Sequence, residues 1–236
     1  MNKYRLNLFI CLVLAFCCCF ISYGCGKKKD KKNKKTVATV NGSKQTDGSA
    51  QEKPLVPSKA PITFEKVYYD FEVGLDGWEI PMWAQGKTDY VAKQILISKD
   101  MVSNGESSMK LLSEFPGGLW SGALIEIQQY LDLSRYRFVI ADIAIPEDAP
   151  AGLRAKLILT VGSNWKFVEM GVSTPLEPGK WVSIKANIEP GSYDWKRVVP
   201  DEEFSKDVRK IAIRIESNRK PKYSGPIYID NIRMAK

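Results

Sequence analysis

The sequence contains no histidine, and all five of its cysteines lie within the first 25 residues. The lack of histidine excludes histidine-based catalytic triads, histidine general bases and histidine metal ligands. The position of the cysteines excludes a disulfide or a thiolate metal site in the rest of the chain. A glycine-rich phosphate loop and a GxSxG nucleophile motif are also absent. Most of the common catalytic arrangements are therefore ruled out.

Excess positive charge is confined to the N-terminal part of the chain. The first 61 residues hold twelve Lys/Arg and three Asp/Glu, whereas the remaining 175 hold 23 and 24. The formal net charge of +8 therefore comes from residues 1–61, and the remaining residues, called the body below, are almost neutral. A body without net positive charge lacks the excess of cations that neutralises nucleic-acid phosphates. We predict no nucleic-acid partner.

The leader, residues 1–25, has the features of an export and anchoring segment. Lys3 and Arg5 precede an uncharged run of 19 residues, 6–24, which is typical of a secretory signal or a short membrane helix. The run ends in Gly24-Cys25, which resembles a bacterial lipobox, where the cysteine is lipidated. We predict lipidation of Cys25 and a lipid-anchored protein of the bacterial cell envelope, in the outer membrane or at the cell surface. The alternative is an uncleaved signal anchor.

Residues 26–61 form a lysine-rich segment of low complexity. They include ten lysines and no aromatic residue, so they cannot bury enough apolar surface to offset their ordering entropy. We predict a disordered tether with a root-mean-square reach of about 30–36 Å. Its lysines either touch anionic lipid headgroups or form a solvated spacer.

The body, residues 62–236, consists of short runs rich in β-branched and aromatic residues, separated by turn signals. Alternation is clear where Ile211, Ile213 and Ile215 alternate with polar or small residues. About ten strands predict an all-β fold, a sandwich (jelly roll) of two antiparallel sheets; only 202–208 has the pattern of a helical turn. The expected strands are 67–72, 90–98, 108–115, 123–129, 137–145, 154–162, 166–170, 181–188, 209–216 and 227–234.

Five segments carry a family resemblance in a fixed order. They are Asp70-Phe71-Glu72 with Gly77-Trp78, the run 105–111, the run 131–146, Gly179-Lys180-Trp181, and the run 225–232. Together they resemble non-catalytic carbohydrate-binding modules with the galactose-binding-like jelly-roll fold. The resemblance covers nearly all of 62–236. It implies binding of a polysaccharide of the mannan, xylan or glucan class, and an envelope glycoside hydrolase as a further partner.

The last expected strand changes phase in its middle. Ile227 and Ile229 have one parity, Ile232 and Met234 have the other, and the change falls at Asp230-Asn231. A β-bulge is the simplest cause, because one extra residue re-aims the side chains that follow.

The family resemblance also implies a structural calcium ion beside this bulge. Carried over by motif, the ligands are Glu72 from the first strand and Asp230, with Asn104 of an early loop as a looser candidate. Calcium takes six to eight oxygens, which fits carboxylates supplemented by carbonyls. The alternative is that Asp230 caps a turn and Glu72 pairs with a lysine.

Six tryptophans must be divided between the core and a binding site. Trp is rigid and amphipathic, and its flat face stacks on the apolar face of a sugar. We assign Trp78 and Trp181 to the core. The other four have loop settings, where large apolar residues are either covered or functional. The candidate ligand-binding residues are Trp83, Trp120, Trp165, Tyr193 and Trp195, with Gln128, Asn164, Glu169 and Asp194 as polar partners.

These observations predict a cell-envelope lipoprotein that binds β-glycan without cleaving it. The 24 acidic residues of the body show no spacing that singles out a glycosidase-like pair, so we do not expect an enzyme. The alternative is a structural or protein-interaction lipoprotein that uses the same sandwich with a degenerate sugar site. A continuous apolar patch without polar neighbours would favour that alternative.

Overall fold

The computed structural model describes residues 61–236. The predicted signal segment, the lipidation site Cys25 and the tether up to residue 60 lie outside the described residues. Within 61–236 the regular elements are all strands, as predicted, and 202–206 form turns in place of a helical turn. No helix in this part of the chain is long and apolar enough to cross a membrane.

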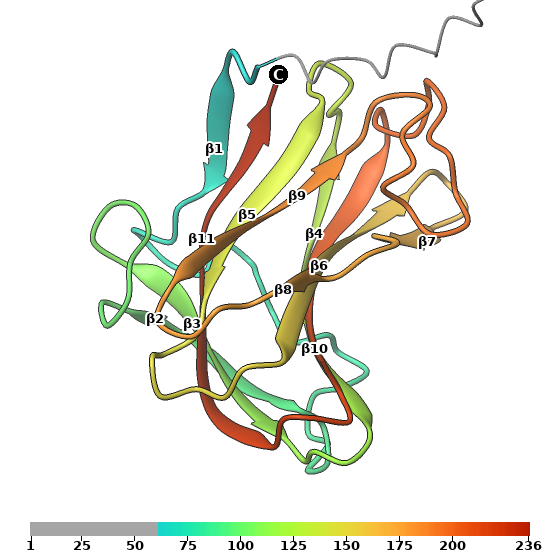
Figure 1. Ribbon diagram of the computed structural model, residues 1–236. Helices are drawn as coiled ribbons and strands as arrows, with labels where there is room; N and C mark the ends of the chain where they lie inside the picture. Colours follow the sequence, from blue (N-terminus) through green and yellow to red (C-terminus); the bar gives the residue numbers. More distant parts are fainter. Residues whose placement is uncertain (1–60) are drawn as a thin grey trace, which may run out of the picture. The chain divides into compact units, whose positions relative to one another are not determined.

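Two antiparallel sheets face each other (Figure 1). The six-stranded sheet has the order β2-β3-β11-β5-β9, with β1 also paired to β11, and the five-stranded sheet has the order β4-β10-β6-β7, with β8 paired to β6. The strands are β1 Glu65–Tyr69, β2 Ala92–Ser98, β3 Ser108–Phe115, β4 Trp120–Leu131, β5 Phe138–Ala144, β6 Leu153–Val161, β7 Lys166–Glu169, β8 Thr174–Pro175, β9 Trp181–Asn187, β10 Val208–Asn218 and β11 Tyr223–Ala235. The two-sheet sandwich predicted from alternation is confirmed, and only the two-residue β8 was missed.

The core fills the space between the inner faces of the sheets. Successive side chains of a strand point to opposite faces, so Ile211, Ile213 and Ile215 of β10 point inward together and are almost fully buried. They meet inward residues of the other sheet, such as Ile227 and Ile229 of β11, in one continuous cluster.

The predicted bulge in β11 is present. The register between β11 and β5 shifts after Asp230, and Asn231 has a left-handed backbone, with φ of 49°. Because of this extra residue, Ile232 and Met234 are as fully buried as Ile227 and Ile229 before it.

Candidate functional site

An open groove lies on the outer face of the five-stranded sheet. The even-numbered residues of β4 and β6, and those of β10 from Lys210 onward, point to this face, and the odd-numbered ones alternate toward the core. The groove has a volume of about 460 Å³. It is lined by Trp83, Tyr90, Trp120, Gly122, Leu124, Glu126, Thr160, Trp165, Phe167, Lys210 and Arg214.

One wall of the groove comes from the segment that precedes β2. Glu79 exchanges two backbone hydrogen bonds of 2.9 Å with Glu126, which fastens this segment to the outer edge of β4. The Tyr90 hydroxyl accepts a hydrogen bond from the Leu124 amide at 2.9 Å. Trp83 packs edge-on against Tyr90, with ring centroids 5.3 Å apart, and still has 57% of its surface exposed. A rigid aromatic wall therefore stands beside β4.

The opposite wall comes from the β6–β7 hairpin. Pairing of Thr160 with Phe167 places the Phe167 ring on the groove face. Trp165, in the turn, packs edge-on against Tyr130 at 6.2 Å, and the Arg209 guanidinium carbon lies 5.1 Å from the Trp165 ring centroid. These contacts hold the Trp165 ring in place while 40% of it stays exposed.

Trp120 begins β4 and has 53% of its surface exposed. Its ring extends along the strand over Gly122, where an added Cβ would lie 3.4 Å from Trp120 Cη2 and 3.4 Å from Arg214 Cδ. Glycine within a strand commonly marks such a close approach. The Arg214 guanidinium carbon lies 5.6 Å from the Trp120 ring centroid. Trp120 and Arg214 thus form one surface in the groove.

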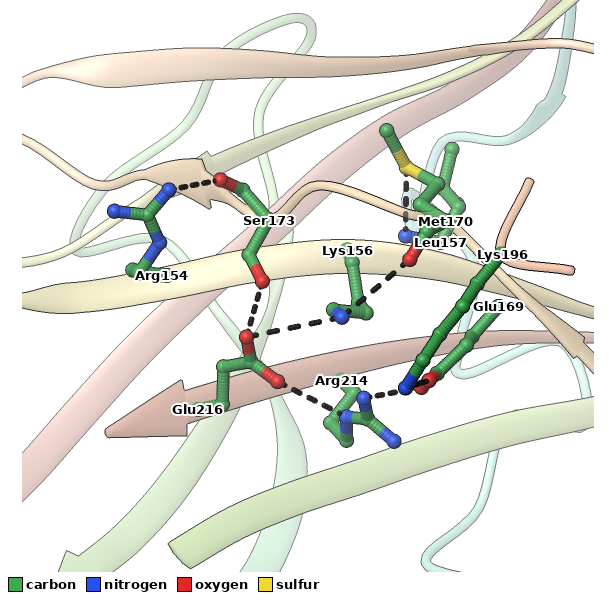
Figure 2. Close-up of polar contacts among 9 residues, drawn as sticks. All are labelled: Arg154, Lys156, Leu157, Glu169, Met170, Ser173, Lys196, Arg214 and Glu216. Carbon is green, nitrogen blue, oxygen red and sulfur yellow. Dashed lines mark hydrogen bonds and ion pairs between the residues drawn. The ribbon is translucent and has the colours of Figure 1, made fainter. Parts of the chain in front are cut away.

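The polar groups of the groove are joined in ion pairs. Lys210 on β10 donates to Glu126 on β4 at 2.6 Å. Arg214 bonds two carboxylates, Glu169 on β7 and Glu216 on β10, as Figure 2 shows. The floor therefore offers oriented, mutually compensated charges between its aromatic walls.

The electrostatics of Glu169 follow from its partners. Partial burial raises the pKa of this carboxyl, but Lys196 and Arg214 outweigh that effect and the pKa is lowered overall. Glu169 is therefore ionised at neutral pH and fixes the Arg214 guanidinium.

Comparison with known proteins gives a fold but no sequence family. No protein-family model matches the sequence, and no curated protein matches it significantly. A CBM27 module of Caldicellulosiruptor saccharolyticus, solved with mannohexaose, superposes with a TM-score of 0.51 at 20% identity over 73% of this chain and 97% of that one. A CBM28 module specific for non-crystalline cellulose gives 0.52 at 15% identity over 71% and 92%. An exo-β-agarase gives 0.50 at 16% identity, over 71% of this chain and 24% of that one.

The fold is that of the carbohydrate-binding-module β-sandwiches. At identities of 20% or less, the likeness establishes this architecture. The predicted jelly-roll fold and the resemblance to such modules are thus confirmed at the level of the fold.

The β-sandwich brings together three of the predicted site residues, which lie far apart in the sequence. Trp83, Trp120 and Trp165 all line the groove. Glu169 lies next to it as a partner of Arg214. Gln128 is exposed on the same face of β4, opposite Lys210 on β10.

The structure removes Trp195 from this set. Trp195 is only 4% exposed, packs on Phe204 and donates from Nε1 to the Asn187 carbonyl at 2.7 Å. Its assignment as a ligand-facing residue is wrong because its loop pairs with the chain at the end of β7, with hydrogen bonds from Gly171 N to Asp194 O and from Lys196 N to Glu169 O.

Three further predicted residues lie outside the groove lining. Asp194 accepts a hydrogen bond from the Asn187 amide at 2.7 Å and so organises its own loop. Asn164 lines a separate small hollow of about 170 Å³. Tyr193 is exposed in the β9–β10 loop. The structure gives none of these three a place in the groove.

The core assignment is right for one tryptophan and wrong for the other. Trp78 is buried against Tyr69 and Phe71. Trp181 is only half-buried, because its parity on β9 is opposite to that of Ile184 and Ala186, which point into the core.

Sequence reasoning missed Tyr90, Phe167, Lys210, Arg214 and Glu126 of the groove lining. The sequence did contain a sign of Lys210, Arg214 and Glu126, namely their alternation with core residues. Lys210 and Arg214 alternate with the core isoleucines of β10, and Glu126 alternates with Ile125 and Ile127 of β4. Charged residues on an outward parity are usually solvated, so this signal alone did not single them out.

The predicted calcium ligands hold the loop after β2 through backbone amides. Asp230 is fully buried and accepts from the amides of Ser103 (2.8 Å), Asn104 (3.0 Å) and Asn231 (2.6 Å). Burial raises the pKa of Asp230, while these three hydrogen bonds act against that rise. Asn104 thus meets Asp230 through its backbone N–H.

Glu72 has a similar role. Its Oε1 accepts from the amides of Glu106 (2.9 Å) and Ser107 (3.2 Å), and a Cβ at Gly105, where φ is +81°, would lie 2.1 Å from this oxygen. N–H donors repel a cation, and no group of three or more acidic, Cys or His side chains in residues 61–236 is arranged to hold a metal. The residues present therefore do not fit the predicted calcium site.

Proposed function

We propose that residues 61–236 form a carbohydrate-binding module that holds a β-linked polysaccharide in the groove and does not cleave it. The observation that carries this proposal is the convergence of Trp83, Trp120 and Trp165 around oriented polar groups. Aromatic faces stack on sugar rings, while the polar floor bonds hydroxyls. Because the groove is open and wet, we expect a Kd of about 10–100 μM, or about −6 to −7 kcal/mol.

The polysaccharide class is inferred from chemistry and from the neighbours with the same fold, which include modules for mannohexaose and non-crystalline cellulose. We propose a mannan, a glucan or a xylan as ligand. An envelope glycoside hydrolase that acts on the same polysaccharide is the partner that such binding would serve.

Affinity electrophoresis of residues 61–236 tests this function. The panel contains soluble β-mannan, hydroxyethylcellulose, mixed-linkage β-glucan and xylan. Retardation in at least one gel without release of reducing ends is the expected result. Trp120→Ala should weaken binding by about 2 kcal/mol or more, as for a central aromatic contact.

Phe64→Ala is the matched control, because Phe64 is 51% exposed, close to the 53% of Trp120, and lies outside the groove lining. It should leave retardation unchanged. If no glycan retards the wild-type protein, the carbohydrate function is wrong. The alternative of a structural or protein-interaction lipoprotein then takes its place.

We propose further that Cys25 carries a lipid that anchors the module to the bacterial cell envelope. Support comes from the uncharged run 6–24 that ends at Gly24-Cys25. Cys25→Ala should release the full-length protein from the membrane fraction or stall its processing. Unchanged size and membrane retention would show that the apolar run itself is the anchor.

A further inference from the structure

We propose that Arg214 is the main hydrogen-bond donor to the glycan, held in a fixed orientation by Glu169 and Glu216 beside the Trp120 ring. This inference rests on the proposed function and names the residue that selects the ligand. Arg214 lies on the outward face of β10, with its side chain 17% exposed, and lines the groove.

Two carboxylates fix the plane of the Arg214 guanidinium. Its Nε donates to Glu216 Oε2 at 3.3 Å, and its NH2 donates to Glu169 Oε2. The two carboxylates come from different strands, β10 and β7 (Figure 2). An arginine fork bound on two sides keeps a single orientation, which a lysine ammonium on its flexible stem would not.

Each of these carboxylates is itself anchored at its second oxygen. Ser173 donates to Glu216 Oε1, and Lys156 Nζ lies 3.8 Å from the same oxygen. Lys196 donates to Glu169 Oε1 at 2.7 Å. The side chains of Glu169 and Glu216 are only 14% and 11% exposed, so the two carboxylates in Figure 2 are largely shielded from water.

One nitrogen of the Arg214 guanidinium remains free to donate to a ligand. Within residues 61–236, its NH1 makes no hydrogen bond, and the guanidinium lies beside the Trp120 ring. A sugar stacked on Trp120 would bring its hydroxyls next to these donors. Because the fork is already ordered, binding loses little side-chain entropy.

The charge of Arg214 is compensated, which bears on the class of glycan. Glu169 and Glu216 both contact the guanidinium, and the other cation of the groove floor, Lys210, is paired with Glu126. Lys156 and Lys196 also contact these two carboxylates, at their other oxygens. A ligand group that bonds Arg214 itself, however, comes next to both carboxylates, which would repel a uronate or a sulfate. We therefore expect the site to prefer hydroxyl groups of a neutral polysaccharide over an acidic one.

The experiment uses residues 61–236 and the polysaccharide of the panel that binds the wild type most tightly. Arg214→Met should raise Kd about 10–100-fold, the range of a hydrogen bond to a charged group. Arg214→Lys should recover only part of this loss. Glu169→Gln should raise Kd severalfold, because the bond that holds the fork becomes a neutral one.

Arg137→Met is the matched control. Like Arg214, Arg137 contacts both a carboxylate and an aromatic ring. Its Nε lies 3.0 Å from Glu189 Oε1, and its guanidinium carbon lies 5.1 Å from the Phe138 ring centroid. It does not line the groove, so its replacement should leave Kd unchanged. Circular dichroism melts of all variants identify any that fail to fold; the isosteric Glu169→Gln and the charge-conserving Arg214→Lys are the variants most certain to fold.

A second arm uses matched neutral and acidic ligands, hydroxyethylcellulose and carboxymethylcellulose. Weaker retardation by the acidic polymer is expected. The inference is overturned if folded Arg214→Met or Arg214→Lys binds as tightly as the wild type, or if the acidic polymer is preferred. Those results leave the carbohydrate function intact, whereas failure of the wild type to bind any glycan would overturn the function itself.

Discussion

Replacing Trp195 by alanine is expected to lower the free energy of unfolding by about 3–5 kcal/mol, as for other buried aromatics, and to leave glycan binding nearly unchanged. Trp195 is 4% exposed, so almost its whole side chain, about 150–250 Å² in a buried Trp, is removed from water. At about 25 cal/mol per Å² this area alone corresponds to about 4–6 kcal/mol, an upper bound because the unfolded chain is partly collapsed.

The indole N–H adds a separate contribution that a second variant isolates. Trp195→Phe keeps a ring against Phe204 and loses the 2.7 Å hydrogen bond to the Asn187 carbonyl. The half-buried Asn187 carbonyl is then left without that donor, which costs about 1 kcal/mol. The phenylalanine variant should therefore lie between the alanine variant and the wild type.

Urea and thermal unfolding of residues 61–236 measure these differences. For a domain of this size, 1 kcal/mol shifts Tm by about 2–4 °C, so Trp195→Ala should melt about 6–20 °C lower. Affinity electrophoresis is then run well below that Tm. A variant that unfolds like the wild type and no longer binds glycan would refute the reasoning, because it would place Trp195 in the binding site.

Three other predictions follow from single contacts. Asp230→Ala should lower the free energy of unfolding by about 1–3 kcal/mol in urea titrations, since three backbone amides lose the buried carboxylate that accepts from them; a chelator should leave the wild-type Tm unchanged, and a clear fall would restore the calcium site. Gly122→Ala should stabilise the fold by about 0.4–1 kcal/mol through the unfolded state and weaken glycan binding, because the new methyl would stand between Trp120 and Arg214; tighter binding would contradict this. Because the pKa of Glu169 is lowered in the fold from its ordinary 4.5, its contribution to stability is present above pH 4.5 and is lost as the pH falls through the folded value; unfolding at several pH values should show less acid destabilisation for Glu169→Gln, and an identical pH profile would contradict it.

The sequence was sufficient for the strands and the core because both depend on local alternation. Residues 108–115 were predicted with the bounds that β3 has, and β10 was recognised from Ile211, Ile213 and Ile215. The bulge at Asp230 was predicted for the same reason, since a change of parity is visible along one strand. Each of these features needs only neighbours in the sequence.

The groove could not be assembled in this way, because its walls depend on which segments pair. Trp83 reaches the groove because Glu79 bonds to β4 at Glu126, 47 residues further along the chain. Phe167 reaches it through pairing of β7 with β6, and Trp195 leaves the surface because its loop is bonded back onto Gly171. The turn-rich sequence around Trp195 gave no sign of this folding back.

The outer faces of the two sheets show why alternation of polar residues does not by itself make a site. On the six-stranded sheet, Asp142 accepts hydrogen bonds from Arg233 and Asn231 at 2.9 Å and from Ser183 at 2.5 Å. The polar groups around Asp142 are therefore already paired with one another. The ion pairs of the five-stranded sheet also compensate one another, but Arg214 keeps donors free and exposed Trp rings stand on both sides. A glycan needs both features together, stacking surfaces and unsatisfied donors between them, and within residues 61–236 the groove on the five-stranded sheet combines them.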